Sequence, residues 1–204
     1  MDDVHRILTF WFGQQPCSND SDYWKQKNTL WFGVNAGADQ HITKTFKPLL
    51  LQAKNNDLCN WQDTASGRLA LIILTDQFPR NIYRRTNKAF SFDRFALKQC
   101  LEGLEAGQHL ELHPVHQVFF FMPLEHSENI KHQNTCAELL SSLVVSSSAE
   151  LLSTMENFHA FAIKHLDIIA QFGRFPHRNA LLGRKSTAAE LEYLQASSST
   201  FGQG

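Results

Sequence analysis

Several features that would assign a function are absent from this sequence, and each absence excludes a class of protein. Four cysteines are spread over 204 residues with no Cys-x-x-Cys pair, a spacing that fits neither a zinc knuckle nor a redox dithiol. Lys and Arg total 19 against 20 Asp and Glu, so the formal net charge of −1 gives no overall field for nucleic acid or acidic membranes. No apolar run approaches the roughly 18 residues of a membrane-spanning helix, and none resembles a signal peptide. We therefore expect a cytoplasmic protein with reduced thiols that binds neither nucleic acid nor membranes.

The fingerprints of common cofactor and catalytic sites are also missing. The sequence contains no P-loop, no dinucleotide-binding glycine pattern and no Gly-x-Ser-x-Gly elbow around a nucleophile. We therefore predict no bound cofactor. No stretch alternates apolar and polar residues with a period of two between hairpin turns, which argues against β-strands.

The sequence is instead rich in aromatic side chains and helical periodicity. It contains 16 Phe and 4 Trp residues, which predicts a bulky aromatic core. Apolar residues recur at spacings of three and four, most clearly over residues 149–172. Residues 66–78 have almost no polar face, which predicts a buried helix, and Pro79 is predicted to end it. The pattern predicts an all-α fold of stacked antiparallel helical hairpins, with a single domain over 1–196 and a frayed tail over 197–204.

Two turns are built around Phe-Pro, one at residues 78–79 and one at residues 175–176, and both concentrate polar and cationic side chains. Arginine forks suit carboxylate and phosphate groups, and helix ends attract anions, so the functional interpretation is an anion-binding pocket. The structural alternative is that the arginines only tie loops together, by pairing with Asp76, Glu125, Glu128 and the carbonyls at helix ends. The candidate ligand-binding residues are Asp76, Gln77, Arg80, Asn81, Arg84, Glu125, His126, His165, Arg174, His177, Arg178, Asn179 and Arg184.

The segment Glu125-His126-Ser127-Glu128 is another polar cluster. Glu125 and His126 are candidate acid/base residues, because burial beside arginine would tune the pKa of either side chain. Glu125, Glu128 and His132 would share one face of a continuous helix, which makes them weak candidates for metal ligands. The simpler alternative is an ordinary helix start, with Ser127 as the N-cap and the acids stabilising the positive end of the helix dipole.

Three long motifs resemble one known family. They are residues 74–84, residues 121–128, and residues 172–179 with their continuation at 182–187. Together with Phe-Trp-Phe-Gly at 10–13, they resemble the bacterial domain-of-unknown-function family 924 over nearly the whole chain. The resemblance implies an all-helical fold grouped with tetratricopeptide-like proteins, and it implies no activity.

The sequence departs from the family pattern at two positions in the first turn region. Thr75 stands where the pattern usually has an apolar residue, and Arg85 stands where it usually has glycine. The Arg85 change adds a charge near the candidate site.

The predicted function is the binding of a small anionic ligand or a peptide carboxylate in a central charged pocket. One alternative is a hydrolase or lyase that uses Glu125 or His126 as acid/base, with arginines holding the substrate oxyanion. Another is an interaction scaffold that binds a protein partner on a concave helical surface. The fold class alone does not decide among these functions, because helical stacks serve all three.

Overall fold

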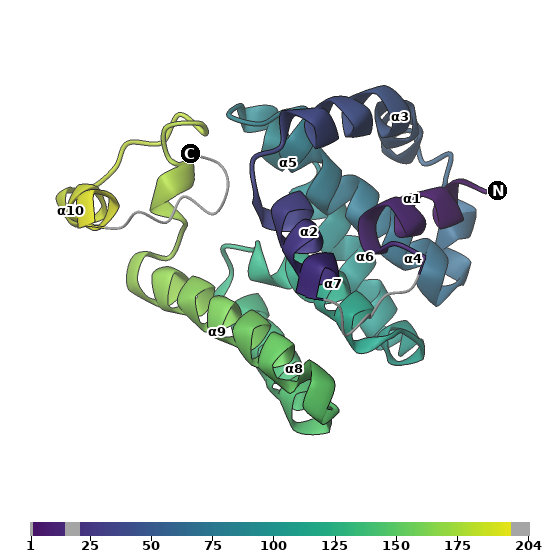
Figure 1. Ribbon diagram of the computed structural model, residues 1–204. Coiled ribbons are helices and arrows are strands. Elements are labelled where there is room, and N and C mark those ends of the chain that lie inside the picture. Colours follow the sequence, from purple (N-terminus) through teal and green to yellow (C-terminus); the bar gives the residue numbers. More distant parts are fainter. Residues whose placement is uncertain (1, 15–20, 197–204) are drawn as a thin grey trace.

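The computed structural model describes residues 2–14 and 21–196, and helices make up most of both ranges (Figure 1). No strand is present in the part of the chain that it describes, so the predicted all-α fold is confirmed. The α-helices are α1 (Asp3–Phe12), α2 (Ser21–Phe32), α3 (Ala36–Lys54), α4 (Ala65–Ile72), α5 (Phe78–Ile82), α6 (Asp93–Glu105), α7 (Pro114–Glu125), α8 (Ile130–Ser146), α9 (Ala149–Phe172) and α10 (Ala188–Ala196). The short helical turns are η1 (Cys59–Asp63), η2 (Ile73–Gln77), η3 (Asn87–Phe90), η4 (Gln108–Glu111) and η5 (Pro176–Arg178).

The helices form a main body and a long hairpin beside it. In the body, α4 packs against α1, α6 and α7, and α3 packs against α5. Helices α8 and α9 form the hairpin, and the chain then leads through η5 to α10 (Figure 1). The predicted hairpin arrangement is therefore clearest at α8 and α9, whereas the tetratricopeptide-like stacking stays a prediction. The predicted tail at 197–204 lies outside the described residues.

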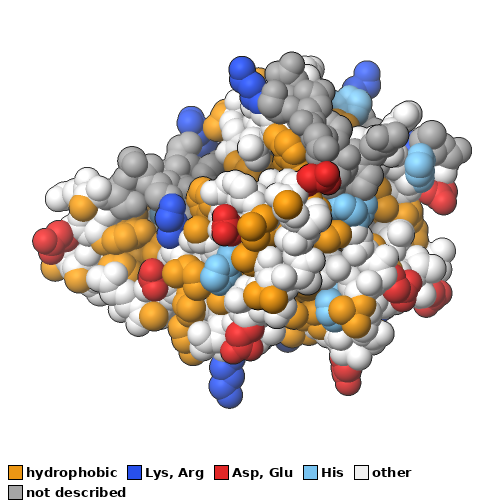
Figure 2. Space-filling model, turned by 60° about the horizontal axis from the view of Figure 1, so that its bottom comes forward, with side chains coloured by type: hydrophobic (Ala, Val, Ile, Leu, Met, Phe, Trp, Pro, Cys, Tyr) orange, Lys and Arg blue, Asp and Glu red, His pale blue; other side chains and the backbone are white. Residues whose placement is uncertain are grey.

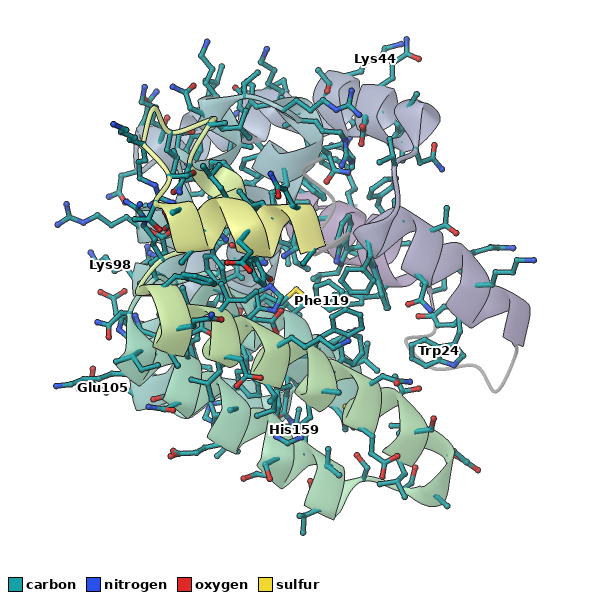
Figure 3. The ribbon with its side chains drawn as sticks, turned by 90° about the vertical axis from the view of Figure 1, so that its left-hand side faces the viewer. Trp24, Lys44, Lys98, Glu105, Phe119 and His159 are labelled. Carbon is teal, nitrogen blue, oxygen red and sulfur yellow. The ribbon has the colours of Figure 1, made fainter. Side chains whose placement is uncertain are left out.

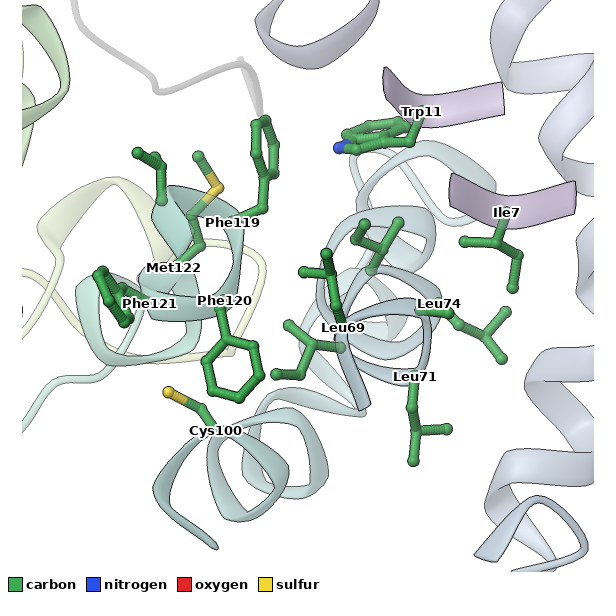
Figure 4. Packing of buried hydrophobic residues seen from close by; sticks show 14 of the residues in the cluster. Ile7, Trp11, Leu69, Leu71, Leu74, Cys100, Phe119, Phe120, Phe121 and Met122 are labelled. Atoms are coloured by element: carbon green, nitrogen blue, oxygen red, sulfur yellow. The ribbon is translucent and has the colours of Figure 1, made fainter. Parts of the chain in front are cut away.

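Aromatic side chains hold the core together, as the composition predicted. Phe119 on α7 is fully buried, and its ring centroid lies 5.9 Å from that of Trp11, 5.3 Å from that of Phe12 and 4.7 Å from that of Trp31. These edge-to-face contacts join α7 to α1 and α2, and Figure 4 shows Phe119 facing Trp11 across the core. The aromatic segment 119–122 is buried throughout, so it is part of the core.

The predicted helix end at Phe78 is wrong. Residues 73–77 form a single turn of π-helix, in which the N–H of Phe78 bonds to the carbonyl of Ile73 five residues back, and α5 then continues to Ile82. Pro79 does not stop the chain because it lies in the first turn of α5, where its missing N–H leaves no helical hydrogen bond unmade. The π turn adds one residue to the helix and often marks a functional site.

The two departures from the family pattern both have a visible structural setting. Thr75 lies in the π turn, and its hydroxyl donates to the carbonyl of Leu71 at 2.7 Å, so the polar side chain is satisfied inside the core. Arg85 adopts φ 61°, the left-handed region that costs a residue with a side chain about 1–2 kcal/mol. A glycine at this position would avoid the strain, so Arg85 keeps the turn conformation at a cost in stability.

The face of the molecule in Figure 2 carries charges of both signs. On the face in Figure 2, basic and acidic side chains are scattered among hydrophobic and uncharged groups, in keeping with the net charge of −1. Within residues 2–14 and 21–196, none of the helices combines the length and the apolar character that a bilayer crossing requires.

Candidate functional site

A cavity of about 700 Å³ lies between α2, the α5 segment, the end of α7, α9 and η5. It draws on both Phe-Pro turns, which are far apart in the sequence. The predicted site residues that line it are Gln77, Arg80, Asn81, Arg84, Glu125, His126, His165, His177 and Arg178. The structure therefore brings together most of the candidate set, although Arg174, Asn179 and Arg184 lie elsewhere.

Asp76 is buried beneath this cavity and organises its floor. It is 0% exposed, and both of its carboxylate oxygens lie 2.9 Å from Nδ1 of His126. Gln77 Nε2 donates to Oδ2 at 2.5 Å, and Arg80 Nη2 lies 3.4 Å from Oδ1. Burial alone would raise the pKa of Asp76, but Arg80 and His126 outweigh it and hold the pKa below its ordinary value. Asp76 is therefore an ionised carboxylate that the π turn places under the site.

This contact sets the tautomer of His126. An ionised carboxylate only accepts hydrogen bonds, so Nδ1 of His126 carries the proton and Nε2 keeps a lone pair. Burial lowers the pKa of His126, so the ring is neutral at neutral pH. Among the described residues Nε2 has no hydrogen-bond partner, and His126 lines the cavity. The cavity therefore contains an oriented neutral imidazole with a free basic nitrogen.

Glu125 and His165 form an uncharged pair next to it. Burial, with the nearby Asp76, raises the pKa of Glu125 to about 8, so its carboxyl group is protonated at neutral pH. Burial lowers the pKa of His165 to about 3, so this ring is neutral. Its Nδ1 donates to the carbonyl of Phe161 at 2.9 Å and lies 3.3 Å from Oε1 of Glu125. Glu125 can therefore act as a proton donor, and the neighbouring His126 can act as a proton acceptor.

Arg178 provides a buried positive charge. Its guanidinium carbon lies 4.3 Å from the ring centroid of Phe175 and 5.0 Å from that of Phe90, and the residue is 7% exposed. Nη1 donates to the carbonyl of His126 at 3.0 Å, at the end of α7, whereas Nε is buried with no hydrogen-bond partner. Burial and the charge of Arg80 lower the pKa of Arg178 to about 10, so it stays protonated at neutral pH.

Two acidic residues that the sequence analysis missed position the other arginines. Asp93 accepts from Arg80 Nη1 at 3.0 Å and lies 3.7 Å from Arg178 Nη1. Asp39 accepts from Nε and Nη2 of Arg84 at 2.9 and 3.0 Å, and from Asn81 at 2.8 Å. Both acids lie in the first turn of a helix, where a carboxylate is common for reasons of the helix dipole. The sequence therefore held no signal that they reach distant arginines.

The remaining candidates hold the C-terminal segment in place, away from the cavity. Glu190 accepts from Nε and Nη2 of Arg174 at 2.6 and 2.8 Å. Glu128 accepts from Nη1 and Nη2 of Arg184 at 2.6 and 2.9 Å, and Asn179 accepts from Nε of Arg184 at 2.9 Å. For this second set the structural alternative, arginines that tie loops together, is the better description.

The proposed metal set does not assemble, because no single helix carries it. Helix α7 ends at Glu125 and α8 begins at Ile130, with Asn129 rather than Ser127 as its N-cap. Glu128 is bonded to Arg184, and Nδ1 of His132 lies 2.8 Å from the hydroxyl of Ser127. In the part of the chain that the structure describes, no group of three or more His, Cys, Asp or Glu side chains is arranged to hold a metal ion.

Fold and cavity together define an all-helical protein with an internal polar site of arginine, histidine and carboxyl side chains. A family model described as "Bacterial protein of unknown function (DUF924)" matches residues 7–198, and the chain belongs to this family, as its motifs predicted. A solved structure of a protein of unknown function from Agrobacterium tumefaciens is similar to it, with a TM-score of 0.79 and 30% sequence identity. That match covers 95% of this chain and 97% of the other. A search of the curated proteins found no match.

Proposed function

We propose that the cavity binds a small molecule or peptide end that carries an acidic group, with Arg178 as the main donor. The observation that carries this proposal is the buried Nε of Arg178, which has no hydrogen-bond partner although the guanidinium is charged. A buried donor left unpaired costs about 1–3 kcal/mol. An anionic ligand oxygen would satisfy it with a charge-assisted hydrogen bond.

The charges around Arg178 support an anion rather than a cation. The carboxylate nearest to Arg178 is Asp93 at 3.7 Å, and Asp93 is bonded more closely by Arg80 at 3.0 Å. Glu125 is protonated at neutral pH, so it does not repel an anion and has a proton to donate. His126, His165 and His177 are neutral, because burial lowers the pKa of each ring.

A thermal-shift screen of carboxylates and phosphates tests this proposal with two variants of Arg178. For an acid that stabilises the wild-type protein, Arg178→Met should weaken binding roughly 10- to 100-fold, because a hydrogen bond between charged groups contributes about 1.5–3 kcal/mol. Arg178→Lys keeps the charge but not the planar fork, so its affinity should lie between the two. Arg94→Met removes an exposed arginine and should bind like the wild type. Equal affinity in Arg178→Met and Arg94→Met would contradict the proposal.

A second candidate function is hydrolysis or elimination by acid/base catalysis, and the Asp76–His126 contact favours it. The dyad leaves Nε2 of His126 as a base, and the protonated Glu125 is an acid on the same cavity wall. The His126→Gln variant should then still bind the acid but no longer convert a substrate. Single-turnover kinetics would separate the binding step from the chemical step. Retained turnover in this variant would exclude His126 as the base. The scaffold alternative requires a concave helical surface that binds a protein partner, and a cavity with charged side chains does not favour it.

A further inference from the structure

The two ends of the cavity differ in chemistry, and α9 runs along both. Thr154, Phe158, Phe161 and His165 line the cavity at spacings of four, three and four residues, so they share one face of this helix. His165 lies at the polar end beside Glu125. With a rise of 1.5 Å per residue, Phe158 lies roughly 10 Å further along the helix axis. The lining that α9 supplies therefore changes from polar at His165 to aromatic at Phe161 and Phe158, over the length of a medium-sized organic molecule, and Asn157 and Thr154 add polar groups beyond it.

The wall opposite is supplied by α2, and it is aromatic too. Trp24 and Trp31 line the cavity seven residues apart on one face of α2, with the polar Asn28 between them. Phe32 follows, and its ring centroid lies 6.2 Å from that of Phe158, so the two walls meet. Figure 3 shows Trp24 lying between the ribbons of α2 and α9.

Two rings of this aromatic half remain open to solvent. Phe32 is 49% exposed and Phe161 is 50% exposed, and both line the cavity. Exposed aromatic side chains that line a cavity, rather than scattered singly over the surface, commonly mark a ligand-binding groove. Because both rings line the cavity that also contains the buried Arg178, we relate these features to one ligand.

We propose that the ligand is an amphipathic acid, with its acidic group on Arg178 and an apolar body about 10 Å long between α2 and α9. This inference rests on the proposed function, because it places the acidic group where that function requires it. It adds that the apolar body supplies most of the affinity. A free fatty or aryl acid and a peptide ending in an aromatic residue share this chemistry, and they differ in the amide group beside the carboxylate.

A series of straight-chain acids separates the two ends of the ligand. Isothermal titration with butyrate, hexanoate, octanoate and decanoate should show affinity rising roughly three- to fourfold per methylene. The gain from butyrate to octanoate should be on the order of 100-fold, with a plateau once the chain exceeds the cavity. Octanol has the same tail without the acid and should bind at least 10-fold more weakly than octanoate. N-acetylphenylalanine tests the peptide end against phenylpropionate, which lacks the amide.

Variants at the aromatic end of the cavity should alter how the affinity for an acid depends on its chain length, and should leave the binding of the acidic group unchanged. Phe161→Ala and Phe32→Ala should reduce octanoate binding about 10-fold while leaving butyrate unchanged, and both should fold because each ring is half exposed. Leu152→Ala removes an exposed side chain of α9 outside the cavity lining and should match the wild type. Arg178→Met should weaken every acid by the same factor.

The outcomes distinguish the two proposals. If no acid binds, or if octanol binds as tightly as octanoate, the proposed function itself fails. If acids bind through Arg178 with an affinity independent of chain length, the anion site stands and the amphipathic ligand is wrong. The same conclusion follows if Phe161→Ala and Phe32→Ala both keep the chain-length dependence of the wild type.

Discussion

Replacing Asp76 by alanine is expected to lower the free energy of unfolding by about 3–5 kcal/mol. The variant loses the acceptor for His126, Gln77 and Arg80 at once, and it leaves the charge of Arg80 buried with less compensation. Asp76→Asn keeps an oxygen for His126 but not the charge, so it should be intermediate. Urea unfolding at neutral pH measures the free energy of unfolding of the wild type, Asp76→Ala and Asp76→Asn.

The pH dependence of the Asp76 effect has a defined sign. Its pKa is held below the ordinary value in the folded state, so its contribution is present at neutral pH and disappears as the pH falls through that lowered pKa. The difference in the free energy of unfolding between the wild type and Asp76→Ala should therefore become smaller at acidic pH. Asp167→Ala, at an exposed position on α9, should stay within about 0.5 kcal/mol of the wild type. A loss below about 1 kcal/mol in Asp76→Ala would mean that the buried network contributes little to stability.

Replacing Glu125 by glutamine is expected to stabilise the protein by an amount that grows with pH. The folded state holds the Glu125 proton up to a pKa of about 8, whereas the unfolded chain releases it near the ordinary 4.5. Between these values the folded state binds more protons, so wild-type stability falls as the pH rises, by at most about 1.4 kcal/mol per pH unit. Glutamine resembles the protonated acid and does not titrate. The advantage of the variant should be near zero at pH 4 and reach up to about 5 kcal/mol above pH 8.

Thermal or urea unfolding of Glu125→Gln and wild type from pH 4 to pH 9 measures this advantage. Glu156→Gln changes an exposed residue of α9 and should show no such trend. An advantage of Glu125→Gln that did not change with pH would show that Glu125 is already ionised in the folded protein. In that case Glu125 would not be the proton donor of the second candidate function.

Periodicity was sufficient to predict the long helices, because a long helix that packs on one side buries an apolar stripe that leaves its spacing in the sequence. The long α9 shows this best, since Met155, Phe158, Ala162 and His165 are all buried as its pattern requires. The predicted stop at Pro79 failed for a physical reason. A single π turn absorbs the proline, and such a turn has no recognisable spacing of its own.

The sequence indicated most residues that line the cavity, but it did not separate them from residues that lie outside it. Arginines next to Phe-Pro indicated an anion site, but nothing in the sequence separates Arg178, which faces the cavity, from Arg184, which pairs with Glu128. That difference depends on which carboxylate the fold brings within reach. Asp39 lies 45 residues from Arg84 in the sequence, and Asp93 lies 13 residues from Arg80. Only the packed structure therefore reveals these pairs.

The π turn of this chain has a consequence for length that a comparison with relatives can test. The turn from Ile73 to Gln77 holds one residue more than an α-helix would need, and this extra residue turns Asp76 and Gln77 toward His126 and Met122. A relative with one residue fewer between its counterparts of Leu74 and Phe78 would keep a continuous helix and a packed core. Its carboxylate would point elsewhere, by about 100° around the helix axis. A one-residue gap at this place in an alignment would therefore separate relatives that have the site from relatives that retain only the fold.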